Sequence, residues 1–262
     1  MAKKLELGVL RYGIMRKLRW QFRLRTLLLA VVLAAVILEA YVLSRPPKPE
    51  YGSVPPQFGQ RQLRIGRLIH SGDWDIAPDA IPNLIQSLRN TPAGFNLMVT
   101  QKDLVPHDPN LIYYSVFYFH GRTTGAFTAA DFNSVRRQLE RAGSTLFADA
   151  ECGDPAFDAS FRRFVATLLP KNPLVPIPTN DALYTTTAGA DLSQVQYTKA
   201  AGGHRDFPQL EGVKIKGHWA VIYSKYGISC ALDRDHDGGC KGYSREDAAK
   251  IGRNVLIYST LP

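Results

Sequence analysis

Residues 146–155 restrict the fold of this chain more than any other stretch. They begin with a short apolar run at 146–148, which is typical of a strand buried on both faces of a parallel sheet. A turn follows at Cys152. Asp154 can then cap a helix, and Pro155 suits the first turn of that helix. The stretch therefore predicts a strand, a tight turn and a helix N-terminus that meet at one thiol.

The segments around this stretch alternate between strand and helix patterns. Strand patterns lie at 63–69, 95–99, 111–119 and 145–150, and helix patterns lie at 78–89, 128–143 and 155–169. The run at 111–119 is apolar or aromatic except at Ser115, which is typical of a central parallel strand. The alternation predicts an α/β fold with a right-handed, doubly wound and mainly parallel sheet.

The C-terminal third of the chain is less regular. Residues 170–210 predict loops and one short strand, and 213–223 predict strand structure on either side of Gly217. Ser244 and Asp247 match a capping box that opens a short helix. The apolar residues 255–258 predict a last strand that closes the domain.

The N-terminal quarter has a different composition from the rest. The chain carries a net charge of +9, but residues 1–25 hold eight Lys or Arg against one Glu, and residues from 51 onward hold 22 Lys or Arg against 20 Asp or Glu. The basic charge therefore belongs to the tail, and we expect no nucleic-acid partner. Residues 45–62 are rich in proline and predict an extended spacer before a folded domain at 63–262.

Between tail and spacer, residues 26–44 are apolar apart from Glu39 and predict one transmembrane helix. The basic flank should stay in the cytoplasm, which places the C-terminal domain outside it, in the periplasm. A cleaved signal peptide is the alternative, but Leu38 and Ala40 make a poor cleavage site. We therefore expect a single-pass membrane anchor.

Several spaced motifs resemble a known bacterial family. They are Phe119-His-Gly121, Ala148-Asp-Ala-Glu-Cys-Gly153, Phe157-Asp-Ala-Ser-Phe-Arg162, Leu210-Glu-Gly212 and Asn254-Val-Leu-Ile-Tyr258. Over about residues 61–262 the chain resembles the family called domain of unknown function 4159. That family is similar in fold to the class I glutamine amidotransferases, which are flavodoxin-like. The resemblance implies this fold and implies no activity.

Three predicted strands end in polar, glycine-containing turns. If the strands are parallel, these turns share one edge of the sheet, which is the usual ligand site of such a fold. The residues predicted to line a ligand-binding cleft there are His70, Asp73, Trp74, His120, Arg122, Asp149 and Cys152. The alternative is that the glycines make tight turns and the polar side chains are only solvated.

Cys152 is the candidate catalytic residue. Amidotransferase-like folds carry a nucleophilic thiol after a strand at a comparable turn, so the resemblance implies this role. A helix N-terminus lowers the pKa of a thiol, whereas nearby carboxylates raise it. Four acids stand close to Cys152 in the sequence, namely Asp149, Glu151, Asp154 and Asp158. The histidines offer no base at a useful spacing from the thiol. We therefore commit to no catalytic residue and interpret Cys152 as a structural cysteine.

A short acidic stretch offers a candidate metal site. Asp233, Asp235 and Asp237, followed by a glycine, match the first half of a calcium loop. Position twelve of that loop is Ser244, where a bidentate glutamate is required. Calcium is the one cofactor that the sequence offers, and a solvated turn is the alternative.

The two cysteines that flank this stretch are Cys230 and Cys240. Outside the cytoplasm they are plausible disulfide partners, which would leave Cys152 as the odd thiol. Three reduced cysteines are the alternative if the topology is reversed.

Together these patterns predict a membrane-anchored α/β domain of the cell envelope, acting as a non-catalytic module that binds a small molecule or another envelope protein. Two alternatives stay open: a hydrolase or amidotransferase-like enzyme that uses Cys152, and a metal-binding protein.

Overall fold

The computed structural model describes residues 29, 31–35, 61–95, 97–233 and 239–261. The chain divides into two compact units, 1–53 and 54–262, and the described residues of the first are helical. None of the helices formed by the described residues has the length and apolar character needed to cross a membrane. The predicted basic tail, most of the predicted span at 26–44 and residues 45–60 of the predicted spacer lie outside the described residues. The predicted end of the spacer at residue 62 is corrected, because the first strand already begins at Arg61.

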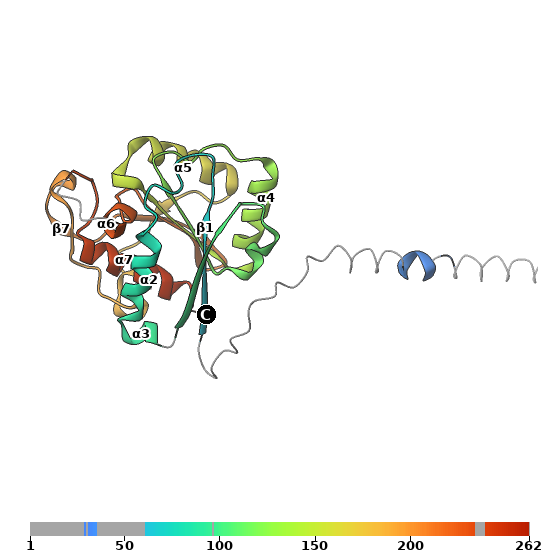
Figure 1. The fold of residues 1–262 in the computed structure, drawn as a ribbon, viewed down its shortest axis with the longest axis horizontal. Helices are drawn as coiled ribbons and strands as arrows, with labels where there is room; N and C mark the ends of the chain where they lie inside the picture. The colour runs from blue at the N-terminus through green and yellow to red at the C-terminus, as the bar shows by residue number, and fades with distance from the viewer. Residues whose placement is uncertain (1–28, 30, 36–60, 96, 234–238, 262) are drawn as a thin grey trace, which may run out of the picture. The chain divides into compact units, whose positions relative to one another are not determined.

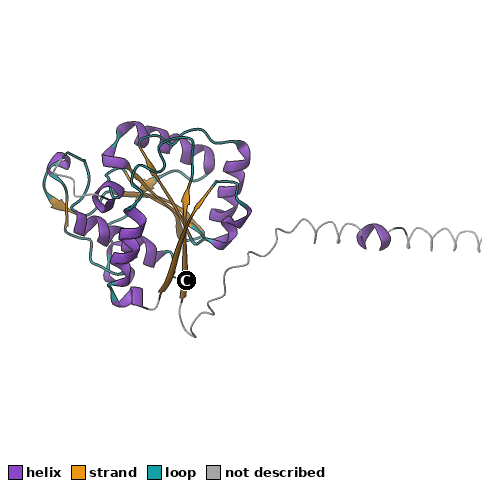
Figure 2. Cartoon of the chain, in the orientation of Figure 1, coloured by secondary structure: helices purple, strands orange, loops and turns teal. Residues whose placement is uncertain are grey.

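The second unit is built on a seven-stranded sheet (Figure 2). From one edge to the other the strands are β2 (Leu97–Leu104), β1 (Arg61–Leu68), β3 (Val116–Gly121), β4 (Thr145–Ala150), β9 (His218–Ser224), β8 (Leu210–Ile215) and β5 (Val175–Pro176). The first five pair in parallel, whereas β8 pairs antiparallel with both β9 and β5. The prediction of a mixed α/β fold with a mainly parallel sheet is confirmed.

Helices cover both faces of this sheet (Figure 1). One face packs against α2 (Ala80–Arg89), α6 (Ser229–Asp233) and α7 (Arg245–Tyr258), and the other packs against α4 (Ala129–Arg137) and α5 (Pro155–Leu168). Side chains of a strand alternate between its two faces, so Tyr118 enters the first core, while Phe117 and Phe119 enter the second. Burial on both faces explains why consecutive residues of β3 and β4, at 117–119 and 146–148, are apolar or aromatic.

Local signals fixed the helix ends where the sequence predicts them. Thr128 and Asp131 form a capping box at the start of α4, with each side chain accepting a hydrogen bond from the backbone of the other residue. The π-helical continuation Gln138–Ala142 ends at Gly143, whose φ of 70° lies in the left-handed region. Asp154 caps α5 by accepting hydrogen bonds from the backbone of Ala156 and Phe157.

Two predicted strands are corrected. The pattern at 111–119 begins as a 3-10 helix, Pro109–Tyr113, capped by Asp108, and becomes a strand only at Val116. Residues 255–258 are not a strand but the last turn of α7. Gly252 allows this helix to approach α2 closely, since a Cβ there would lie 2.7 Å from Leu84 Cδ1. A short apolar run does not distinguish a buried strand from a buried helix.

The remaining elements are short. They are α3 (Pro92–Phe95), the two-stranded sheet of β6 (Val195–Gln196) and β7 (Arg205–Asp206), and 3-10 helices at Glu151–Gly153, Ala182–Tyr184, Thr186–Ala188 and Lys199–Ala201. Buried Asn254 of α7 holds this irregular region in place. Its Nδ2 donates hydrogen bonds to the carbonyls of Leu183 and Ala190, and its Oδ1 accepts one from the Ala190 backbone.

Candidate functional site

The turn after β4 brings the strand, the thiol and the helix together as the sequence predicts. Cys152 has a φ of 50°, in the left-handed region that few residues other than glycine adopt. Gly153 follows with a φ of 67°, and a Cβ at that position would lie 2.6 Å from the Lys241 carbonyl oxygen. The turn therefore needs both an unusual backbone and room for a second chain segment.

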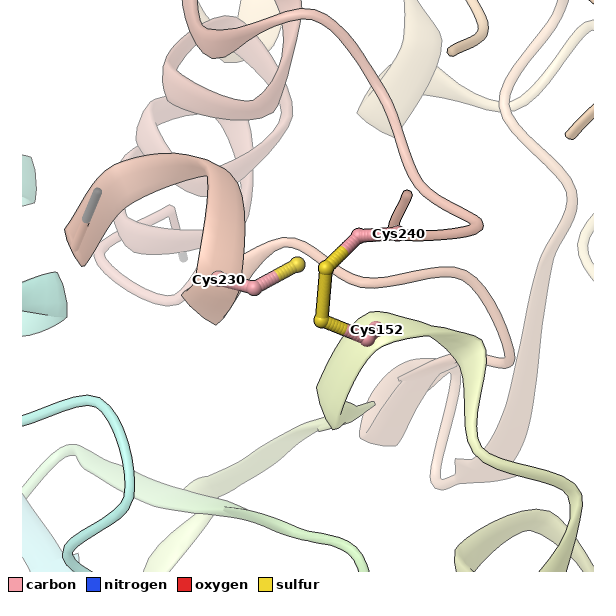
Figure 3. Close-up of side chains that lie close together, drawn as sticks. All are labelled: Cys152, Cys230 and Cys240. Atoms are coloured by element: carbon pink, nitrogen blue, oxygen red, sulfur yellow. A yellow bond between two sulfur atoms is a disulfide. The ribbon is translucent and has the colours of Figure 1, made fainter. Parts of the chain in front are cut away.

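That second segment determines which two cysteines form the disulfide. The Lys241 backbone donates a hydrogen bond to the Cys152 carbonyl at 3.1 Å, and this contact places Cys240 opposite Cys152. The two form a disulfide, and Cys230 of α6 is a buried free thiol (Figure 3). The predicted pairing of Cys230 with Cys240 is wrong, because closeness in the sequence did not decide which sulfur the returning chain would meet.

Two carboxylates lie buried beside this turn. Asp149 Oδ1 accepts a hydrogen bond from the Tyr118 hydroxyl at 2.8 Å, and Asp149 Oδ2 accepts bonds from the backbones of Ile228 and Ser229 at 2.8 and 2.9 Å. Burial raises the pKa of Asp149, although these hydrogen bonds act in the opposite direction. Asp149 therefore ties the end of β4 to the start of α6.

Ser229 connects Asp149 to the second carboxylate, Glu151. The Ser229 hydroxyl lies 2.7 Å from Asp149 Oδ2 and 2.6 Å from Glu151 Oε2. A hydroxyl carries one hydrogen, so two such short contacts require a further proton on one of the acids. Burial raises the pKa of Glu151 to about 7, and the charge of Asp149 adds to this effect. Burial and the neighbouring Asp149 charge thus favour a proton on Glu151.

The other predicted cleft residues lie at the ends of β1 and β3, where His120 is the register partner of Asp149 on β4. Asp73 Oδ1 accepts hydrogen bonds from the backbones of Arg122 and Thr123 at 2.9 and 3.0 Å. The half-buried Trp74 packs under the Arg67 guanidinium, 5.0 Å from its ring centroid. The Asp73 carboxylate thus joins the two loops to each other.

Two buried histidines lie behind these loops. His70 Nε2 lies 3.0 Å from the His120 carbonyl oxygen, and burial lowers the pKa of His70. Burial also lowers the pKa of His120 to about 3, and neither of its ring nitrogens has a hydrogen-bond partner among the described residues. His120 stacks on Tyr118 at 5.0 Å between ring centroids. Both histidines are neutral core residues at physiological pH.

A cavity of about 410 Å³ opens at the same edge of the sheet, where β9 ends and β8 begins. Its walls combine aromatic, apolar and charged side chains, among them Arg162, Tyr184, Phe207, Leu210, Glu211 and Lys225. Arg162 binds Glu211 and Asp158, which hold its guanidinium in place and raise its pKa. Sequence reasoning missed this cavity, although Arg162 and Leu210 lie in motifs of the family resemblance.

Of the three aspartates of the predicted calcium loop, Asp233 lies among the described residues. Asp233 ends α6, and its Oδ1 accepts a hydrogen bond from the Asp79 backbone at 2.7 Å. Asp235 and Asp237 lie outside the described residues. Among the described residues, the side chains gathered closely enough to hold a metal ion are Cys152, Cys230 and Cys240.

These features define an α/β domain with a mainly parallel sheet and an oxidised cysteine at a strand-to-helix turn. The family described as Domain of unknown function (DUF4159) matches residues 64–260, and the chain belongs to that family. A comparison with curated proteins finds no match.

Proposed function

We propose that this chain is a non-catalytic binding module of the cell envelope, with a flavodoxin-like, amidotransferase-like domain carried on a single membrane anchor. The order of the five parallel strands, β2-β1-β3-β4-β9, supports the fold assignment, because flavodoxin-like sheets have the order 2-1-3-4-5. The basic tail and the apolar run at 26–44 support the anchor.

The observation that carries the proposal is the bond between Cys152 and Cys240. Covalent catalysis by cysteine needs a thiolate and a base that takes its proton. The Cys152 sulfur is bonded to Cys240 in the disulfide, and its polar neighbour at 4.0 Å is the Glu151 carboxyl rather than a histidine. The position that a nucleophile would occupy thus has a structural use, which favours binding over chemistry.

The cavity beside β9 is the binding site in this proposal. Half-buried Phe207 contacts Tyr184 edge-on at 5.7 Å, and together they form an aromatic wall. The Arg162–Glu211 ion pair and the exposed Lys225 supply polar groups to the same lining. Apolar walls with a few fixed polar groups suit a small molecule, or a side chain of a partner, that combines an aromatic part with a polar end.

Saturation-transfer NMR tests this site with two matched probes, phenylacetate and phenethylamine, on the full chain in lipid nanodiscs. We expect at least one of them to receive saturation, and Phe207→Ala to abolish the transfer by removing the aromatic wall. The matched control is Ile112→Ala, which truncates an apolar side chain that is 51% exposed and outside the cavity lining. Absence of transfer to both probes, or equal transfer to parent and Phe207→Ala, would contradict the proposal.

A further inference from the structure

Three sulfur atoms meet at the edge of the sheet from three different parts of the chain. Cys152 comes from the turn after β4, Cys230 from α6, and Cys240 from the segment that leads into α7 (Figure 3). The three sulfurs lie within 4.8 Å of one another. Only two of them can share a disulfide, so the third thiol faces the bridge without being needed for it.

This arrangement matches the ligand set of a thiolate metal site. Zinc binds cysteine sulfur at about 2.3 Å in a tetrahedron, which places two ligand sulfurs roughly 3.8 Å apart. The Cys230 sulfur therefore needs to move by about 1 Å at most, and the Cys152 and Cys240 sulfurs must separate from about 2 Å to about 3.8 Å once their bridge opens. Glu151 Oε1 lies 4.0 Å from the Cys152 sulfur and, once the carboxyl has released its proton, offers an oxygen as a fourth ligand.

The backbone around the sulfurs is held close before any ion arrives. A Cβ at Gly227 would lie 2.5 Å from the Cys230 sulfur and 2.9 Å from the Cys152 nitrogen. The backbone of Gly227 also donates a hydrogen bond to the Lys241 carbonyl at 2.9 Å, which joins α6 to the segment that carries Cys240. A site framed in this way loses little conformational entropy on binding an ion.

We propose that the reduced chain binds one thiophilic divalent cation, zinc foremost, through Cys152, Cys230 and Cys240. A dithiol reductant opens the bridge: it is oxidised to a disulfide, and its two electrons and two protons convert Cys152 and Cys240 to thiols. Zinc then displaces the thiol protons to the solvent. The disulfide and the metal site use the same two sulfurs, so the two forms exclude each other.

The test uses the full chain in mild detergent, prepared in a reduced and an oxidised form without oxygen. Cobalt(II) is the probe, because its thiolate complexes absorb in the near ultraviolet and its tetrahedral complexes absorb visible light. We expect one cobalt per reduced chain, displaced by one equivalent of zinc, and none per oxidised chain. Metal content measured by mass spectrometry should give the same ratio.

Cys230→Ser is the deciding variant, because it removes one ligand and leaves both partners of the disulfide. Its fold is checked in the oxidised form, where peptide mapping should still find the Cys152–Cys240 bridge. In the reduced form we expect its cobalt affinity to fall at least tenfold. A reduced parent chain without the thiolate absorption, or a Cys230→Ser variant that binds cobalt as tightly as the parent, would overturn the proposal.

Discussion

Replacement of Glu151 by glutamine should change how the stability of the domain depends on pH. Glu151 is 4% exposed, and its Oε2 lies 2.6 Å from the Ser229 hydroxyl. In the protonated form the Glu151 carboxyl donates to Ser229, which frees the Ser229 hydrogen for Asp149. A glutamine amide can donate to Ser229 in the same way without carrying a proton that titrates.

The size of the effect follows from the pKa of Glu151. Burial raises that pKa from 4.5 to about 7, so between these values the native chain keeps a proton that the unfolded chain has lost. The contribution of Glu151 to stability is therefore fully present below pH 4.5 and is lost as the pH rises through 7. At about 1.4 kcal/mol per pH unit, the loss amounts to about 3 kcal/mol. Since Glu151→Gln does not titrate, it should gain about 3 kcal/mol relative to the parent between pH 4 and pH 8.

Urea unfolding of the oxidised chain measures this difference, with the buried Trp219 as a fluorescent reporter. Other groups titrate in the same range, but they contribute equally to parent and variant and cancel in the difference. Glu246→Gln is the matched control, because it makes the same acid-to-amide change at a side chain that is 80% exposed. A constant difference between parent and Glu151→Gln from pH 4 to pH 8 would refute the assignment of the extra proton to Glu151.

The remaining predictions concern the bridge, two buried side chains and topology. Cys240→Ser should lower the free energy of unfolding by about 4 kcal/mol, because the bridge joins residues 88 apart. Cys230→Ser should lower the free energy of unfolding of the oxidised chain much less. A non-reduced peptide in which Cys230 forms the bridge would contradict both expectations. Asn254→Ala should cost about 3 kcal/mol in urea unfolding by removing three buried hydrogen bonds, and a loss below 1 kcal/mol would count against that role. His120 has a pKa of about 3 and stays neutral in the native chain, whereas in the unfolded chain it takes up a proton below pH 6.5, so acid destabilises the parent. His120→Phe should reduce the difference in the free energy of unfolding between pH 5 and pH 7. A reporter enzyme fused after Pro262 should be active only outside the cytoplasm, and protection of the domain inside spheroplasts would contradict the topology.

Local sequence signals determined much of the fold. The caps at Thr128 and Asp154 act on backbone groups two or three residues away, so the sequence alone places the starts of α4 and α5. The apolar residues 146–148 likewise predict a strand buried on both faces, and the structure has β4 there. Alternation of such segments was sufficient to predict the α/β class and the mainly parallel sheet.

Other features depend on segments that are distant in the sequence. The apolar residues 255–258 are the end of α7, in which Gly252 packs closely on Leu84 of α2, and no local pattern encodes that contact. Cys240 met Cys152 rather than Cys230 because the Lys241 backbone pairs with the turn after β4. The proton shared through Ser229 arises only when α6 folds onto the end of β4. A sequence records which groups a chain carries, whereas distances between groups far apart along it, and hence pairing and pKa, exist only after the chain has folded.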